Sequence, residues 1–209
     1  LHPTEPQIAC ISVDLDNRSS LKIINSENAE LVDSITMEMG IHIQQPKYDA
    51  TGAKIVAIAV GPAGTNLIAF DLNKKSYTFL LDWSNQQLER PLFYEDKIIF
   101  KAHYNGIDNL YLLDKGQVSA LTNASYGAFN PYVSSEGTLY YNDYKYNGFK
   151  AVKAALKPIE NPESLARTNY LEPTLSAMQA EINRLKPPVS SAADSSLYPI
   201  SDYNSFPNS

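Results

Sequence analysis

Apolar and polar residues alternate along most of this chain in short runs, without the wider spacing of an amphipathic helix. In the stretch 91–130, apolar runs start after short turns and end at Asp, Asn, Gly or Lys. The runs are rich in Ile, Val, Leu, Tyr and Phe, which fit the half-buried surface of a pleated sheet. The pattern predicts an all-β protein made of short antiparallel strands.

The strand pattern repeats. Each unit starts with a proline, and the units from Pro46 and Pro91 share an Asn-Leu run that ends in Asp: NLIAFD from Asn66 aligns with NLYLLD from Asn109. The period lies between 40 and 45 residues, as the aligned prolines show: Pro46, Pro91, Pro131 and Pro173. About four short strands with this period are typical of a β-propeller blade.

Strands can be assigned within the units from the inside outward. In the 91 unit they are expected at Pro91–Tyr94, Ile98–Ala102, Asn109–Leu113 and Val118–Leu121. The chain opens partway through a unit, since Ile8–Val13 matches a second strand and the innermost one is shortened to residues 1–6 or absent. The fourth unit is expected to end with an outer strand at Glu163–Arg167. A further inner strand is expected to start at Tyr170–Pro173.

The pattern then changes. Leu175, Met178, Ile182 and Leu185 lie on one face of a helix, with Thr174 as its cap, and a Pro-Pro pair after it ends the segment. Packing against the core is favoured over partner binding for this helix. Residues 189–209 are rich in Ser, Asp and Pro, which predicts an extended tail. Residues 1–175 are therefore assigned to about four blades, the first incomplete, and 176–209 to the helix and tail.

The motifs PKYDATGAKI and PYVSSEGTLYY resemble the TolB-type, WD40-like (PD40-type) repeats of bacterial envelope β-propellers, although the 91 unit lacks the turn glycine. The resemblance covers roughly residues 6 to 175. It implies a periplasmic or outer-membrane-associated location. The tail segment SLYPISDYN is similar to a stretch that follows such propellers in some large Gram-negative envelope proteins. TolB-like relatives usually have more blades, so the chain is expected to be a partial propeller of a longer polypeptide.

Composition narrows the possible functions. The net charge of −6 argues against a nucleic-acid partner, because binding phosphates relies on clustered Lys and Arg. A single cysteine, Cys10, excludes an internal disulfide, and no apolar run is long enough to span a membrane. The three histidines, His2, His42 and His103, are scattered and predict no zinc site. With no nucleophile elbow and no phosphate loop, we expect no cofactor, no metal and no catalytic residue.

Binding is the remaining function. In propellers the loops between second and third strands share one face around the channel mouth, and that face usually engages ligands. Tyrosine offers a rigid apolar body with a polar tip, although each of these tyrosines can also be an ordinary cross-strand residue. The ligand-binding candidates on these loops are His103, Tyr104, Asn105, Tyr144, Tyr146 and Asn147.

We expect a binding or scaffolding module with a protein, peptide or glycan partner. Two alternatives stay open: an accessory propeller of a hydrolase or peptidase whose catalytic domain lies outside this chain, and a carbohydrate- or peptide-binding surface domain. An open arc of blades leaves apolar end faces. We therefore expect a homo-oligomer, association with missing blades, or closure of a small ring by pairing of Tyr170–Ser176 with Ile8–Val13.

Overall fold

A computed structural model describes residues 1–160 and 172–185. Strands account for most of the first range, as the alternating pattern predicts. The bounds of the strands are β1 Gln7–Val13, β2 Ser19–Asn25, β3 Leu31–Thr36, β4 His42–Tyr48, β5 Lys54–Gly61, β6 Gly64–Asp71, β7 Ser76–Phe79, β8 Glu89–Tyr94, β9 Lys97–Ala102, β10 Asn109–Asp114, β11 Gln117–Ala120, β12 Ala128–Val133, β13 Thr138–Lys145 and β14 Gly148–Ala155.

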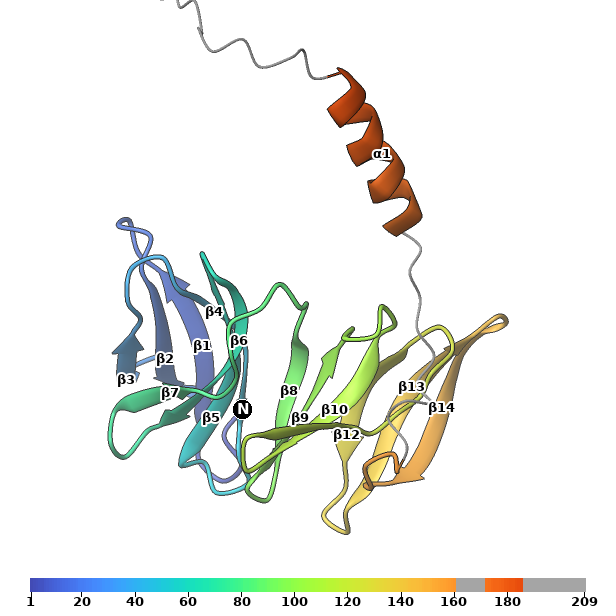
Figure 1. Ribbon diagram of the computed structural model, residues 1–209. Coiled ribbons are helices and arrows are strands. Elements are labelled where there is room, and N and C mark those ends of the chain that lie inside the picture. Colours follow the sequence, from blue (N-terminus) through green and yellow to red (C-terminus); the bar gives the residue numbers. More distant parts are fainter. Residues whose placement is uncertain (161–171, 186–209) are drawn as a thin grey trace, which may run out of the picture. The chain divides into compact units, whose positions relative to one another are not determined.

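The strands form four antiparallel sheets that follow one another in chain order (Figure 1). The second and third sheets, β4–β7 and β8–β11, have four strands each, and their strand order in space equals their order in sequence. The first sheet, β1–β3, begins at the strand assigned to the second position, so its inner strand is absent within the described residues, as predicted. The fourth sheet contains β12–β14, and its predicted outer strand at 163–167 lies outside the described residues.

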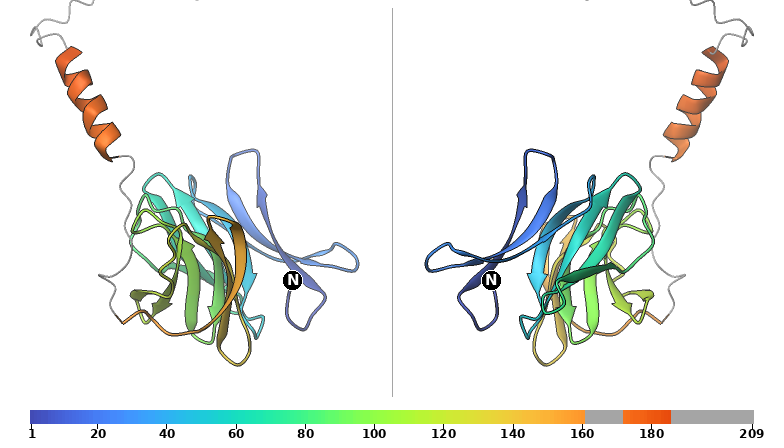
Figure 2. Two further views of the ribbon diagram at one scale, coloured as in Figure 1. Left: turned by 90° about the vertical axis from the view of Figure 1, so that its right-hand side faces the viewer. Right: turned by 90° about the vertical axis from the view of Figure 1, so that its left-hand side faces the viewer.

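Neighbouring sheets pack face to face around three separate apolar layers. Leu21 and Ile55 belong to the layer between the first and second sheets. Val56 and Phe100 belong to the next layer, and Leu139 belongs to the layer between the third and fourth sheets. The inner strands β4, β8 and β12 contact one another in succession, so the first strand of each unit is innermost, as predicted. The arrangement is a partial β-propeller, with its two end sheets seen from outside in Figure 2.

The asparagine of each Asn-Leu motif explains why the motif repeats. The Asn66 side chain donates to the Leu81 carbonyl (2.6 Å) and accepts from the Leu81 N–H (2.9 Å). The Asn109 side chain accepts from the Thr122 hydroxyl and the Ala124 N–H, both at 2.9 Å. Each asparagine therefore ties its blade to the connection that leads to the next blade, and satisfies backbone groups that have no strand partner.

The turns between first and second strands also follow the sequence pattern. Gly52 and Gly137 have φ of 78° and 75°, the left-handed region that glycine enters without a Cβ clash. In the third sheet, where the turn glycine is missing, Glu95 adopts a φ of 53°. The shorter turn of that unit is therefore built on a non-glycine residue in the same left-handed region.

The predicted C-terminal helix is confirmed as α1, Glu172–Leu185. The predicted inner strand at Tyr170–Pro173 is wrong where it can be examined, because Glu172 and Pro173 are helical. Proline is tolerated in the first turn of a helix, where its missing N–H needs no partner. Thr174 consequently lies inside the helix and does not cap it. Closure of the ring by Tyr170–Ser176 as a strand is wrong for the same reason.

The chain divides into two compact units, Leu1–Thr168 and Asn169–Ser209. The proposed boundary between residues 175 and 176 stays a prediction. Residues 189–209 lie outside the described ranges, as does the Pro-Pro pair expected to end the helix. In the part of the chain that the structure describes, no helix is long and apolar enough to cross a membrane.

Candidate functional site

The loop between β9 and β10 carries three of the predicted ligand-binding residues, His103, Tyr104 and Asn105. Its fold is set locally by a turn in which the Gly106 N–H donates to the His103 carbonyl (2.8 Å). The Asn105 side-chain oxygen accepts from the Tyr111 hydroxyl (3.3 Å), which joins the loop to β10. The loop is therefore held in place by its own hydrogen bonds.

Two neighbouring aromatic rings hold the Tyr104 ring in place, while part of the ring stays exposed. It lies edge-on to Tyr111, with ring centroids 4.8 Å apart and an interplanar angle of 88°, and edge-on to Phe100 at 6.4 Å. Even so, 42% of Tyr104 is exposed. Edge-to-face contacts of this kind favour one ring orientation. Tyr104 is thus an exposed aromatic side chain with a predefined position.

An open hollow of about 490 Å³ lies beside these rings, lined by Tyr104, Tyr111, Val118, Ala120 and Ile159 among others. We call it the Tyr104 hollow. Ile159 reaches it because its N–H donates to the Ala120 carbonyl (2.8 Å), which lays the chain after β14 along the outer strand β11. The hollow combines apolar walls with two tyrosine side chains, the exposed Tyr104 and the buried Tyr111.

The two phenols of the hollow stay protonated at neutral pH. Burial raises the pKa of Tyr104, and burial, with smaller contributions from Tyr104 and Asp108, raises the pKa of Tyr111 to about 12. Both hydroxyls are therefore neutral hydrogen-bond donors, and that of Tyr111 already donates to Asn105. Neither is poised to act as a base near neutral pH.

The other predicted residues, Tyr144, Tyr146 and Asn147, lie on the β13–β14 hairpin. Tyr146 is 92% exposed at the tip of this hairpin. Tyr144 contacts Phe149 across the two strands, with ring centroids 4.9 Å apart. Tyr144 belongs to the face of the fourth sheet that points away from the third sheet, because it follows by three residues Tyr141, which packs into the layer between the two sheets, and side chains an odd number of residues apart point to opposite faces.

The predicted residues therefore form two clusters. Tyr104 packs with Phe100 and Tyr111, which belong to the layer between the second and third sheets. Tyr144 packs with Phe149 on the far side of the fourth sheet. Each cluster has its own aromatic partners. Whether either binds a ligand stays a prediction.

One residue near this face was missed by sequence reasoning. Lys101 is 4% exposed, and its ammonium contacts Asp108 (2.9 Å) and Glu89 (3.3 Å) and lies 5.2 Å from the centre of the Phe129 ring. A buried lysine requires such carboxylate partners. The sequence carried one signal for it, since Lys101 interrupts the apolar run of β9, and the structure places it directly opposite Glu89.

Through its contacts, Lys101 connects its own strand β9 with three other elements near the β9–β10 loop. Asp108 belongs to the β9–β10 loop, Glu89 starts β8, and Phe129 belongs to β12 of the next sheet. The lysine thereby fixes the base of the loop that carries Tyr104, and has a positioning role.

Across residues 1–160 and 172–185, no three His, Cys, Asp or Glu side chains gather closely enough to hold a metal ion.

Comparison with known proteins identifies the fold. No protein-family profile matches the chain, and no curated protein sequence matches it either. TolB from Acinetobacter baumannii is similar in structure, with a TM-score of 0.60 at 17% identity, over 74% of this chain and 39% of that one. An oligogalacturonate lyase in complex with manganese has a TM-score of 0.55 at 15% identity, over 76% of this chain and 48% of the lyase.

A puromycin hydrolase is similar to the same extent, with a TM-score of 0.55 at 15% identity, over 74% of this chain and 26% of the hydrolase. The chain thus spans less than half the length of each of these three proteins. The fold is that of the TolB-type β-propellers. The same blades occur in a lyase and a hydrolase, so the fold leaves the activity of the parent protein open.

Proposed function

We propose that this chain is a non-catalytic, protein-binding propeller module, and that the Tyr104 hollow is its principal contact with the partner. The observation that carries the proposal is the exposed, pre-oriented Tyr104 ring beside an open hollow of about 490 Å³. Tyrosines of this kind are enriched among the residues that dominate binding energy at protein interfaces.

The chemistry of the hollow favours a protein or peptide over a glycan. Val118, Ala120 and Ile159 supply an apolar wall, which matches an aliphatic or aromatic side chain of a partner. Because Tyr104 is held by Tyr111 and Phe100 before binding, little conformational entropy is lost when the partner docks. His103 and Asn105 lie on the same loop and are proposed as polar contacts at its rim.

The β13–β14 hairpin is proposed as a second contact, through Tyr144, Tyr146 and Asn147. It is separate from the hollow, so a partner that used both would span the third and fourth sheets. We also propose a location in the bacterial envelope, periplasmic or associated with the outer membrane. This rests on the resemblance of the repeats to TolB-type envelope propellers.

A displayed library of random peptides tests the proposal. Peptides are selected on the immobilised chain and then measured against Tyr104→Ala and against Tyr126→Ala, a control that removes a tyrosine 59% exposed outside the hollow. We expect selected peptides to bind the control like the original chain and to bind Tyr104→Ala at least about tenfold more weakly, a loss of about 1.4 kcal/mol. Selected peptides that bind all three proteins equally would exclude the hollow as the site.

The non-catalytic part of the proposal has its own assay. The purified chain should not hydrolyse generic peptide or ester substrates. Turnover that persisted through purification and disappeared on substitution of one residue of this chain would overturn it.

The second candidate is an accessory propeller of a hydrolase. It is favoured by the structural similarity to the puromycin hydrolase, in which the matched part is 26% of the chain. The full-length reading frame distinguishes the two candidates, because a hydrolase domain next to these blades would support the accessory role.

A further inference from the structure

The three inner strands share a backbone feature that the repeat motif alone does not reveal. In each of β4, β8 and β12 the pairing with the next strand shifts register around a residue that precedes proline. Those residues, Gln45, Arg90 and Asn130, have φ of 55°, 53° and 51°. A residue with a side chain is unfavourable in this left-handed region by roughly 1 kcal/mol or more. Because the conformation recurs in all three inner strands, it is a consistent feature of the blades.

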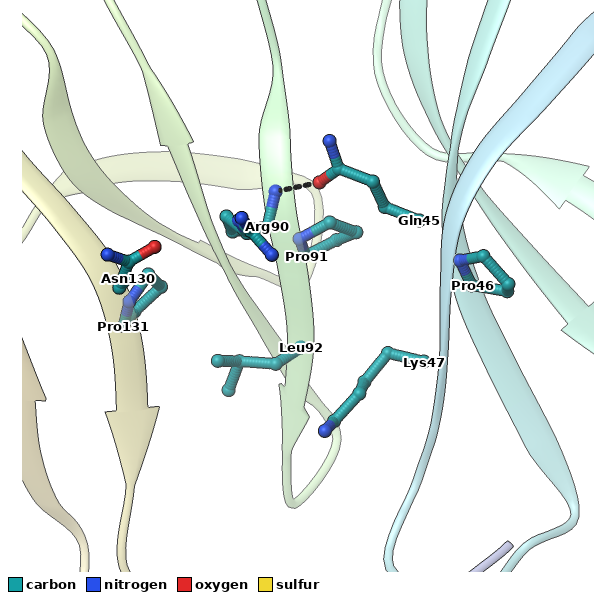
Figure 3. A pocket seen from close by; sticks show the side chains of 8 residues that line it. All are labelled: Gln45, Pro46, Lys47, Arg90, Pro91, Leu92, Asn130 and Pro131. Atoms are coloured by element: carbon teal, nitrogen blue, oxygen red, sulfur yellow. Dashed lines mark hydrogen bonds between the residues drawn. The ribbon is translucent and has the colours of Figure 1, made fainter. Parts of the chain in front are cut away.

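A β-bulge of this kind changes the direction in which its side chain points. Here the three bulges border one hollow between the inner strands, with a volume of about 330 Å³ (Figure 3). Lys47 and Leu92 complete its lining. We call it the inner-strand groove. It shares no lining residue with the Tyr104 hollow.

The lining of the inner-strand groove includes two cationic side chains, Lys47 and Arg90, and no acidic residue. Lys47 and Arg90 are both exposed, and within residues 1–160 and 172–185 neither forms an ion pair. The chain as a whole carries a net charge of −6. The groove, with its two cations outside any ion pair, is therefore locally positive on a negatively charged protein. A hollow flanked by like charges raises the local concentration of an oppositely charged ligand.

A hydrogen bond between sheets organises the groove. The Gln45 side-chain oxygen, on β4, accepts from the Arg90 backbone N–H, on β8, at 2.6 Å (Figure 3). This bond connects the second and third sheets at the point where Arg90 departs from the ladder. It fixes the backbone of Arg90 and leaves the guanidinium available for a bidentate contact with a carboxylate.

We propose that the inner-strand groove binds a carboxylate of an extended acidic peptide segment. The carboxylate lies between Lys47 and Arg90, and the neighbouring apolar side chain packs on Leu92 and the proline rings. Arginine suits this role because its planar fork matches a carboxylate, and lysine adds a second charge without a fixed geometry. The proline rings offer a rigid apolar surface that loses no side-chain freedom on binding.

Fluorescence polarisation tests the proposal with a short fluorescein-labelled peptide in which glutamate and leucine alternate. A matched peptide carries glutamine at each glutamate. The variants are Lys47→Gln and Arg90→Gln, which remove charge and keep length. Lys150→Gln is the control, since Lys150 is an exposed lysine outside the groove.

We expect the glutamate peptide to bind, and each groove variant to weaken it about tenfold, the effect of losing one charge-assisted hydrogen bond. The Lys150 control should bind like the original chain, and added salt should weaken binding because both cations are exposed. Unchanged melting temperatures of the variants would show that their folds are intact.

Three results would overturn the proposal. Equal binding of the glutamine peptide would show that no carboxylate is recognised. Full affinity in both groove variants would place the peptide elsewhere. Displacement by inorganic phosphate or glutarate at the affinity of the peptide would show a site for small anions, with no peptide recognition.

Discussion

Replacing Asn109 by alanine tests the physical basis of the repeat. Asn109 is completely buried, and its side-chain oxygen is the acceptor for the Ala124 N–H and the Thr122 hydroxyl. A buried donor left without a partner is unfavourable by about 1–3 kcal/mol. The Thr122 hydroxyl also accepts from the Leu110 N–H (2.9 Å), so that residue keeps one of its two bonds. We therefore expect a loss of about 2–4 kcal/mol in the free energy of unfolding.

The equivalent asparagine of the second sheet gives an internal comparison. Asn66 is buried as completely as Asn109, but its two bonds go to the backbone of Leu81, which is only half-buried, so water can replace the partner that Leu81 loses. Asn66→Ala should therefore lose less, about 1–2 kcal/mol. Asn73→Ala is the matched control, because Asn73 is exposed in the turn after β6, and its loss should stay within about 0.5 kcal/mol.

Urea unfolding followed by the fluorescence of the single tryptophan, Trp83, measures all three variants. With a slope of about 2–3 kcal/mol per molar urea, Asn109→Ala should lower the midpoint by about 1 M. The order expected for the loss is Asn109, then Asn66, then Asn73. If Asn109→Ala unfolded at the same urea concentration as the control, the motif would not owe its recurrence to these hydrogen bonds.

Further predictions concern single features of the fold. Burial raises the pKa of Tyr111 to about 12, so its protonated form stabilises the fold fully below about pH 10 and that stability is lost as pH rises toward 12; Tyr111→Phe should remove one late step from the absorbance titration of tyrosine. Lys101→Met should lower stability by about 2–3 kcal/mol in thermal unfolding, because Glu89 and Asp108 then lose the cation that neutralises both carboxylates. Gly137→Ala should lower the melting temperature more than Gly116→Ala, since both have positive φ but only at Gly137 would a Cβ fall 2.6 Å from the Tyr94 hydroxyl. Sedimentation of the purified chain should show association, and a stable monomer with uncovered end sheets would contradict the expectation that the arc needs a partner.

Much of the blade structure was predictable because the strands are specified locally. The alternation of apolar and polar residues shows which face of each strand is buried. The Asn-Leu motif marks the third strand of a unit, and Asp or Ser followed by Gly marks the turn between the first and second strands. The strand predicted at Asn109–Leu113 is found as Asn109–Asp114. The strand predicted at Pro91–Tyr94 begins at Glu89, since the bulge around Arg90 lets pairing continue before the proline.

The prediction failed at Pro173 because the same residue starts both kinds of element. A proline fits the beginning of an edge strand and the first turn of a helix equally well. The repeat period favoured a strand at Pro173. In the structure, the helix indicated by the apolar spacing from Leu175 onward begins earlier, at Glu172. The candidate site was only partly predictable, because loop position does not show which neighbours each tyrosine contacts across sheets.

Alternation along the end sheets shows which end of the arc needs a partner. In β13, Leu139 and Tyr141 face the third sheet, so Tyr140 and Tyr144 point outward, and Phe149 on β14 joins them. These three outward rings are 39%, 42% and 61% exposed. In the first sheet the inward positions hold Ala9 and Leu21, which leaves the pairs Cys10–Lys22 and Ile8–Ile24 on the outward face.

The two ends of the arc are therefore chemically different, within the residues described. An aromatic sheet face is the type of surface that packs against another sheet or a second copy of the chain. The outward face of the first sheet has no aromatic side chain and combines Lys22 with aliphatic residues, so it gains less from being covered. If the chain associates, the contact should therefore form on the fourth sheet. Replacing Tyr140 and Tyr144 by serine should reduce association in sedimentation, whereas replacing Lys22 should leave it unchanged.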